Sequence, residues 1–251
     1  MNSYRSVAAR IVKRIQALAA SRGLLVMRYS ESNYLTPHLT KAINTFQIDT
    51  VIDVGANLGQ TVDELRASGF DGKIVSFEPT PGLFRALVAK HGSDPGWTGH
   101  QLALGSEPGQ MLLRRYSSED FNSFLTPSDY GAERFGTLGE GVVREEAVTI
   151  ARLDDVWCDL IPSGRVLLKI DTQGFDLEVI AGAAASLKHV FAVLTEVPIA
   201  PIYEGMPRMV DVLTKMESHG FQLSGLFPIS LSADQTRLVE ANCVFLRALA
   251  P

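Results

Sequence analysis

Short apolar runs alternate with amphipathic stretches along most of the chain. The runs have the length of strands and are centred near 50–54, 73–77, 99–104, 166–170 and 191–197. Helical spacing of apolar residues follows near 60–68, 80–90 and 176–188. Strands that alternate with helices predict a doubly wound α/β fold with a mostly parallel sheet.

The carboxyl-terminal part breaks this alternation. A helix is expected over 207–219, and the apolar runs 220–227 and 243–248 follow with no helix between them. They predict an antiparallel strand pair that closes the sheet. The segments 111–116 and 146–153 flank a long polar loop, and we expect a hairpin-like insertion there. Long loops in compact domains often cover or bind a ligand.

The sequence VIDVGANLGQ at 51–60 is the most informative motif in the chain. An apolar run ends at Asp53, passes through a turn that contains Gly55 and Gly59, and leads into the helix expected near 60–68. Strand, glycine turn and helix form the usual nucleotide-binding unit, because glycines let a ligand approach the backbone and the helix start offers free N–H groups. The motif predicts a bound nucleoside.

A carboxylate at the end of the next strand supports this interpretation. Glu78 lies roughly 20 residues beyond the turn, where such a group accepts hydrogen bonds from ribose hydroxyls. Pro79 follows it and favours an extended exit from the strand. Glu78 is therefore the strongest single candidate for a cofactor contact.

The spacing of the glycines distinguishes between cofactors. A dinucleotide fingerprint requires glycines at 55, 57 and 60, but Asn57 and Gln60 occupy two of these positions. A phosphate-binding P-loop requires a lysine after Gly59, where Gln60 and Thr61 stand instead. S-adenosylmethionine contains a ribose and no phosphate, and it fits this turn better.

Several further motifs occur in order along the chain. They are Ala103-Leu104-Gly105, KIDTQGFDLEVIAGA at 169–183, VLTEV at 193–197 and PIYEGMPRMVDVLTKMESHGF at 201–221. Together with the glycine turn this set resembles the FkbM family of methyltransferases over residues 48–246. The family's usual acid in its KIDVEG-like motif is replaced by Gln173.

The resemblance implies a class I methyltransferase fold with S-adenosylmethionine as cofactor. It places Asp53 near the methionine amino group or in the organisation of the turn. The expected cofactor contacts are Asp53, Gly55, Ala56, Asn57, Gly59, Gln60, Thr61, Glu78, Pro79, Ala103, Leu104 and Asp171. Asn57 also tolerates a left-handed backbone, so it either allows the conformation of the turn or contacts the cofactor.

Two carboxylates at strand ends are the candidate catalytic residues. Ligands of an open α/β sheet bind beyond the carboxyl ends of its strands, where Asp171 and Glu196 are expected. Asp171 is expected to stabilise the cofactor cation or to act as the base. Alternatively, it has a purely structural role and caps the following helix. Glu196 binds the acceptor or takes its proton, unless loop N–H groups satisfy it. Tyr203 and Glu204 are expected in the acceptor pocket, although Tyr203 could serve packing alone.

Composition restricts the acceptor. The chain has 251 residues, 46% of them hydrophobic, and a net charge of -5, which gives no general attraction to a polyanion such as nucleic acid. The two cysteines and five histidines show no metal-binding spacing, so we expect no metal, and the unpaired cysteines are typical of the cytoplasm. A small molecule or glycolipid is the expected acceptor.

The amino-terminal part differs from the rest, and we divide the chain into a helical appendage, 1–47, and a methyltransferase domain, 48–251. Residues 1–28 carry six basic and no acidic side chains, with an apolar stripe that includes Ile11 and Ile15. Such a helix packs against the domain or a second subunit, or contacts an anionic membrane surface. No segment is long and apolar enough to span a membrane.

The sequence thus predicts an S-adenosylmethionine-dependent methyltransferase that methylates a hydroxyl of a sugar, a glycolipid or another secondary metabolite. A non-catalytic protein that retains the fold and a nicotinamide-dependent oxidoreductase are the alternatives. The acceptor, the methylated position and the oligomeric state are left open.

Overall fold

The computed structural model describes residues 18, 34–160 and 164–248. Of the basic, amphipathic segment 1–28, only Leu18 is among these residues. The predicted contact of this segment with the domain, a second subunit or a membrane stays a prediction. Among the described helices, none has the length and apolarity required to cross a membrane.

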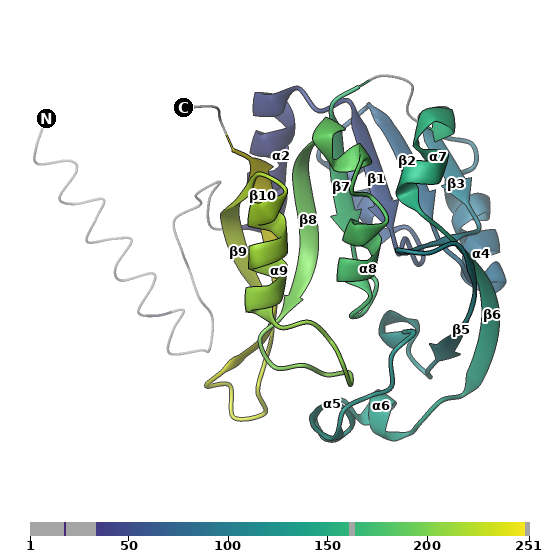
Figure 1. Cartoon of the computed structure of the whole chain (residues 1–251), viewed down its shortest axis with the longest axis vertical. Coiled ribbons are helices and arrows are strands. Elements are labelled where there is room, and N and C mark those ends of the chain that lie inside the picture. Colours follow the sequence, from purple (N-terminus) through teal and green to yellow (C-terminus); the bar gives the residue numbers. More distant parts are fainter. Residues whose placement is uncertain (1–17, 19–33, 161–163, 249–251) are drawn as a thin grey trace, which may run out of the picture.

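A seven-stranded sheet forms the centre of the molecule (Figure 1). Its strands are β1 (Thr50–Val54), β2 (Lys73–Phe77), β3 (Trp97–His100), β7 (Val166–Ile170), β8 (Val190–Pro198), β9 (Phe221–Leu231) and β10 (Leu238–Arg247). Their order is β3-β2-β1-β7-β8-β10-β9, and only β10 runs antiparallel to its neighbours β8 and β9. The predicted fold class and the antiparallel closing pair are confirmed.

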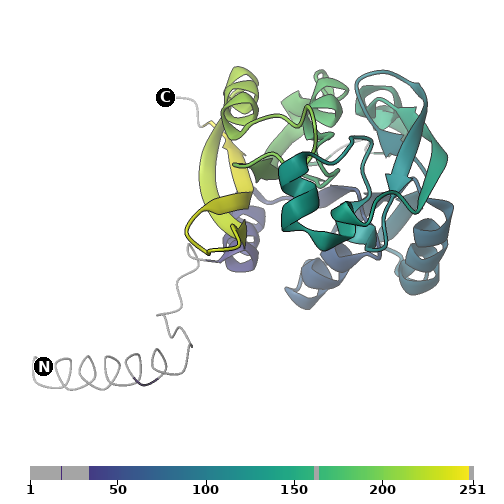
Figure 2. The ribbon, with the colours of Figure 1, turned by 90° about the horizontal axis from the view of Figure 1, so that it is seen from below.

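Helices cover both faces of this sheet. They are α2 (Leu35–Phe46), α3 (Gln60–Ala67), α4 (Pro81–His91), α7 (Leu153–Leu160), α8 (Asp176–Ala181) and α9 (Met209–Ser218). Figure 2 shows α7, α8 and α9 on one side and α2, α3 and α4 on the other. Side chains alternate along a strand, so Ile52 and Leu168 pack under the first group while Val51 and Leu167 pack under the second.

Two of these helices were not predicted. α7 begins directly after the insertion, where the sequence favoured a strand up to residue 153. α2 lies within the predicted appendage, yet its Ile43 packs in the same cluster as Val51 of the sheet. The predicted helix at 176–188 ends at Ala181, and a short 3₁₀ turn follows at Ser186–His189. The division of the chain at residue 48 stays a prediction.

The third strand is shorter than expected. β3 ends at His100, whereas Ala103 and Leu104 form β4 in a different sheet. The ladder with β2 ends where the Glu78 N–H donates to the His100 carbonyl oxygen at 3.1 Å. The next donors bond elsewhere, since the Thr80 N–H donates to Glu78 Oε1 and the Leu102 N–H donates to the His100 carbonyl oxygen. His100, the second residue of the strand expected near 99–104, therefore lies at the end of β3.

The insertion is a hairpin, as predicted. β5 (Gly109–Arg115) pairs antiparallel with β6 (Arg144–Ala151), and the small sheet has the order β4-β6-β5. The intervening loop contains the short helices η1 (Glu119–Phe121), α5 (Asp129–Arg134) and α6 (Gly136–Gly139). Figure 1 places α5 and α6 beyond the carboxyl ends of the parallel strands. The insertion thus covers the edge of the sheet where a ligand is expected.

Gly55 has a structural role that the sequence did not indicate. Its φ is +76°, and a Cβ at this position would lie 1.9 Å from the carbonyl oxygen of Asp171. A glycine is therefore required at position 55 because the loop after β7 packs directly against its backbone, in addition to any requirement of a ligand.

We predict that Gly55→Ala lowers the free energy of unfolding by about 3 kcal/mol or more, because strain and steric overlap add. Gly69→Ala is the matched control, since its φ is +88° and nothing lies within 4 Å of the added Cβ. That variant should lose only about 1 kcal/mol. Urea denaturation measures both, and equal losses would contradict the close packing of the two loops.

Candidate active site

A cavity of about 340 Å³ lies at the carboxyl ends of the parallel strands, beneath the insertion. Most of the predicted site residues line it. They are Gly55, Ala56, Asn57, Gln60, Thr61, Glu78, Pro79, Ala103, Leu104, Asp171 and Glu196. The carboxyl ends of β1, β2, β7 and β8 thus meet in one place, as the position of these residues in the sequence predicted.

Four predicted residues do not line the cavity. Asp53 is fully buried behind it, and Gly59 packs against the imidazole of His91. Tyr203 is buried, and Glu204 is exposed. Direct contact of these four residues with a ligand stays a prediction, and their position outside the cavity lining speaks against it.

The glycine turn presents polar atoms to the cavity through Asn57. Its φ is +48°, so the left-handed backbone is as anticipated. The backbone N–H donates to Glu78 Oε2 at 3.0 Å, and the side-chain Nδ2 donates to Asp120 Oδ1 at 3.0 Å. The Oδ1 atom is buried and has no hydrogen-bond partner among the described residues. An unpaired buried acceptor of this kind suits a donor on a ligand.

Glu78 is held rigidly at the end of β2. Besides Asn57, its carboxylate accepts hydrogen bonds from the Thr80 N–H at 2.9 Å and the Thr80 hydroxyl at 2.5 Å. Burial raises the pKa of Glu78, although these three hydrogen bonds lower it in part. The carboxylate is 5% exposed and is already oriented before a ligand arrives.

Lys169 is the main residue that sequence reasoning missed. Its Nζ lies 3.0 Å from Asp53 Oδ1, 3.5 Å from Asp171 Oδ2 and 3.2 Å from the Gly55 carbonyl oxygen. Burial lowers the pKa of Lys169, but the attraction of the two carboxylates outweighs it and raises the pKa overall. A lysine inside the otherwise apolar strand VLLKI was the available signal, since buried lysines are nearly always paired.

Asp53 depends on this lysine. Its carboxylate oxygens accept no well-directed hydrogen bond from the described residues, and the Lys169 ammonium is the cation beside them. Asp53 therefore organises the turn indirectly, through Lys169, in agreement with one of its two predicted roles.

The Asp171 and Glu196 carboxylates are joined by one side chain. Gln173 Nε2 donates to Asp171 Oδ1 at 3.2 Å and to Glu196 Oε2 at 2.9 Å. Burial raises the pKa of Glu196 well above its usual value, and the negative charges of Asp171, Glu240 and Asp176 raise it further. Glu196 is thus a carboxyl group that takes up a proton more readily than an exposed glutamate does.

A second buried acid stabilises the loop after β7. Asp176 accepts hydrogen bonds from the hydroxyls of Thr195 at 2.9 Å and Thr172 at 3.1 Å, and from the Gly174 N–H at 3.3 Å. Burial raises its pKa to about 6. Asp176, rather than Asp171, holds this loop and the start of α8, so the Asp171 carboxylate is left facing the cavity.

The insertion supplies one wall of the cavity. Glu119, Asp120, Asn122 and Phe124 line it together with Leu113 of β5. Ser123, which lies between Asn122 and Phe124, does not line the cavity. Its hydroxyl donates to the Gln173 carbonyl oxygen at 2.7 Å and ties the insertion to the loop after β7.

Acidic side chains outnumber basic ones in the lining of the cavity. Its carboxylates belong to Glu78, Glu119, Asp120, Asp171 and Glu196, and Lys169 is the cationic side chain among the lining residues. In the described part of the chain, no group of three or more His, Cys, Asp and Glu side chains is arranged to hold a metal ion. The cavity therefore suits a cationic ligand and a neutral partner better than an anion.

Comparison with known proteins extends this description. A model of the methyltransferase FkbM domain matches residues 53–223. Methyltransferase sdnD of Sordaria araneosa is 28% identical over 173 residues, a match that spans 59% of this chain and 65% of that protein. The chain thus covers slightly less than two thirds of this relative.

Solved structures of methyltransferases resemble this chain in the fold alone. Fibrillarin of Aeropyrum pernix, solved with natively bound S-adenosyl-L-methionine, is 11% identical with a TM-score of 0.44, and 82% of this chain and 73% of that one are covered. Precorrin-6y C5,15-methyltransferase of Geobacter metallireducens is 8% identical with a TM-score of 0.43, and the coverage is 88% and 93%. Similarity at this level carries no inference about an acceptor.

We predict that Lys169→Met lowers the free energy of unfolding by about 3 to 5 kcal/mol, because the buried Asp53 carboxylate is left without a cation. Asp53→Asn combined with Lys169→Met should recover at least half of this loss, since the uncompensated charge is then gone. Chemical denaturation of the two single variants and the double variant provides the thermodynamic cycle. Strictly additive losses would show that the two side chains do not depend on one another.

Proposed function

Because the chain belongs to the methyltransferase FkbM domain family, we propose that it transfers a methyl group from S-adenosylmethionine to a hydroxyl of a small neutral acceptor. Membership in this family favours methyl transfer over the oxidoreductase alternative. The observation that carries the proposal is the meeting of Glu78, Asp171 and Glu196 in one cavity behind the glycine turn.

The lining residues fit S-adenosylmethionine. Glu78 would accept the ribose hydroxyls, because two oxygens in a fixed orientation match two neighbouring donors. The unpaired Asn57 Oδ1 offers one further acceptor. Apolar side chains on the same wall, among them Leu83 and Phe124, would pack against the adenine ring. No phosphate needs to be accommodated, in agreement with an acid-rich lining.

The two carboxylates have different environments and hence different proposed roles. Asp171 lies 3.5 Å from Lys169 and accepts a hydrogen bond from Gln173, so its carboxylate is held beside the cavity and would stabilise the sulfonium charge. Glu196 has a raised pKa, and the hydrogen bond that its carboxylate receives from the described residues is the one that Gln173 donates to Oε2. A carboxyl group of this kind is suited to accept a proton from an acceptor hydroxyl.

When bound, S-adenosylmethionine supplies an electrophilic methyl group attached to a sulfonium. Transfer to oxygen requires that the hydroxyl be aligned with this carbon and give up its proton. Glu196 would take the proton, and the insertion would exclude water from the site. Positioning and desolvation would thus supply most of the rate enhancement.

The acceptor class follows from the charge of the lining. With five carboxylates and one lysine, a phosphate or carboxylate on the acceptor would be repelled. Lys169 cannot serve such an anion because Asp53 and Asp171 already surround it. The same charges support the prediction that nucleic acid is not the substrate. A sugar, a glycolipid headgroup or another neutral metabolite with hydroxyl groups meets these conditions.

The cofactor assignment is tested by calorimetry with S-adenosylhomocysteine. We expect Glu78→Ala to weaken binding by about 1 to 3 kcal/mol, because a charged hydrogen-bond partner of the ribose is lost. Glu64→Ala on the exposed face of α3 is the matched control and should bind like the wild type. Absence of binding by the wild type would overturn the assignment.

The catalytic role is tested by methyl transfer to panels of neutral glycosides, glycolipids, phosphorylated sugars and amines. Products are expected with neutral hydroxyl compounds, and Glu196→Gln should reduce their formation by about 100-fold or more without altering S-adenosylhomocysteine binding. Glu217→Gln, an exposed residue of α9, serves as the control. Methylation of amines alone would contradict transfer to oxygen.

A further inference from the structure

Between the two cavity carboxylates lies Gln173, where the family motif usually has an acid. We infer that Gln173 is a positioning residue: its amide holds Asp171 and Glu196 together and leaves one Glu196 oxygen available to the acceptor. The inference rests on the proposed function, because it assigns a task to a neighbour of the proposed base. Gln173 acts on the reaction through Glu196.

The backbone at this position is unusual. Gln173 has a φ of +50° and is followed by Gly174 at +95°, so two consecutive residues adopt the left-handed region. This conformation is uncommon for a residue with a side chain and has to be maintained by its surroundings. The Ser123 hydroxyl, which donates to the Gln173 carbonyl oxygen at 2.7 Å, supplies part of that support. The turn directs the amide between the ends of β7 and β8.

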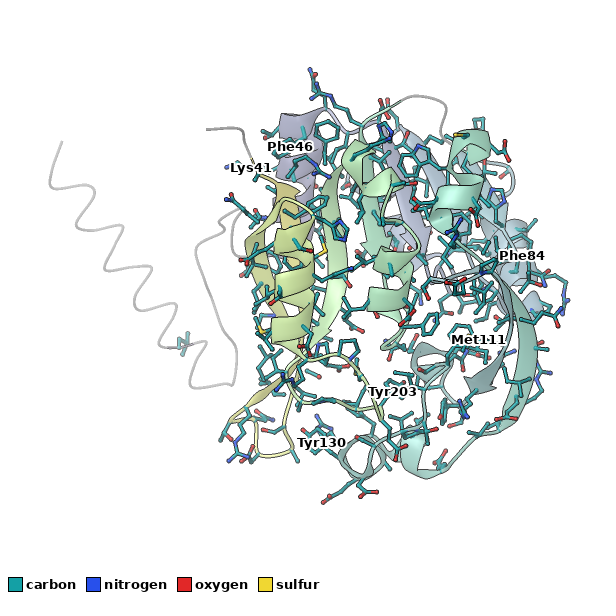
Figure 3. All side chains as sticks on the ribbon, in the orientation of Figure 1. Lys41, Phe46, Phe84, Met111, Tyr130 and Tyr203 are labelled. Atoms are coloured by element: carbon teal, nitrogen blue, oxygen red, sulfur yellow. The ribbon has the colours of Figure 1, made fainter. Side chains whose placement is uncertain are left out.

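Both N–H groups of the amide donate to carboxylates. The two N–H bonds of Nε2 reach Asp171 Oδ1 at 3.2 Å and Glu196 Oε2 at 2.9 Å. The Tyr203 hydroxyl lies 3.3 Å from Gln173 Oε1 and 2.9 Å from the Phe121 carbonyl oxygen. A reversed amide would point its oxygen at two carboxylates, so the observed orientation is the one that chemistry favours. In Figure 3, Tyr203 lies where the loop after β8 meets the insertion.

A neutral donor has a specific consequence here. A carboxylate at position 173, as in the usual family motif, would be a third acid within hydrogen-bond distance of the other two. Such a group requires an extra proton to remain there. The glutamine instead donates one hydrogen bond to each acid, and the hydrogen bond to Glu196 favours the ionised form of that group. Glu196 is thereby retained as a proton acceptor, oriented through Oε2 and free at Oε1.

Charged and titratable groups reach Glu196 from every neighbouring element. They are Lys169 of β7, Asp171 and Asp176 of the following loop and helix, Glu240 of β10, and Tyr203 of the segment after β8. Asp171, Asp176 and Glu240 disfavour ionisation of Glu196, Lys169 favours it, and the phenol of Tyr203, whose pKa is raised by burial, is neutral. The neutral donor at 173 therefore opposes the combined effect of several like charges.

The test is an NMR titration of the Glu196 carboxyl carbon in cofactor-free protein, assigned with Glu196→Gln. Gln173→Met keeps the side-chain length but removes the donated hydrogen bond, so the titration midpoint should rise by about one to two pH units. Gln173→Glu should raise it as well, because a third acid is added. The matched control is Gln235→Met, an exposed residue that shares the left-handed backbone with a φ of +57°.

An unchanged midpoint in folded Gln173→Met and Gln173→Glu would overturn the inference. If Gln173→Met does not fold, Gln173→Glu decides the question alone. Because the titration requires neither cofactor nor acceptor, it is independent of the proposed function, which fails separately if the wild type does not bind S-adenosylhomocysteine. Once an acceptor is found, the acidic limb of the kcat/KM profile should move by the same interval as the NMR midpoint.

Discussion

A buried ammonium group holds the site together. Lys169 lies within 3.5 Å of the end of β1, the glycine turn and the loop after β7, through Asp53 Oδ1, the Gly55 carbonyl oxygen and Asp171 Oδ2. A charge in this position is tolerated only because carboxylates compensate it. The backbone hydrogen-bond ladder sets the distance between β1 and β7, and the ammonium group joins the turn after β1 to the loop after β7. Residues of both segments line the cavity.

The chemistry of the cavity follows from that arrangement. Asp171 lies beside the Lys169 ammonium group, while burial and the acids around Glu196 raise the pKa of that group. Two carboxylates at the ends of adjacent strands thereby have different electrostatic surroundings, as a reaction that needs a group to stabilise a cation and a group to accept a proton requires. The insertion completes the wall, and the Ser123 hydroxyl connects it to the same loop that carries Asp171.

The sequence predicted the parts of this site that depend on local pattern. Strand ends, the left-handed turn at Asn57 and the position of Glu78 follow from alternation and spacing, and the cavity contains them. It did not predict features that depend on contacts between distant segments. The pairing of Asp53 with Lys169 and the burial of Tyr203 against the insertion arise only when separate elements pack. The early end of β3 was missed because it depends on where the N–H groups after Glu78 and His100 find their acceptors, which the apolar pattern does not show.

A crystal structure of the protein with S-adenosylhomocysteine bound is the most direct test of the account. We expect both ribose hydroxyls within hydrogen-bond distance of the Glu78 carboxylate, and the sulfur atom on the side of the cavity formed by Asp171 and Glu196. A ligand bound outside this cavity, or one whose sulfur lies away from both carboxylates, would contradict it.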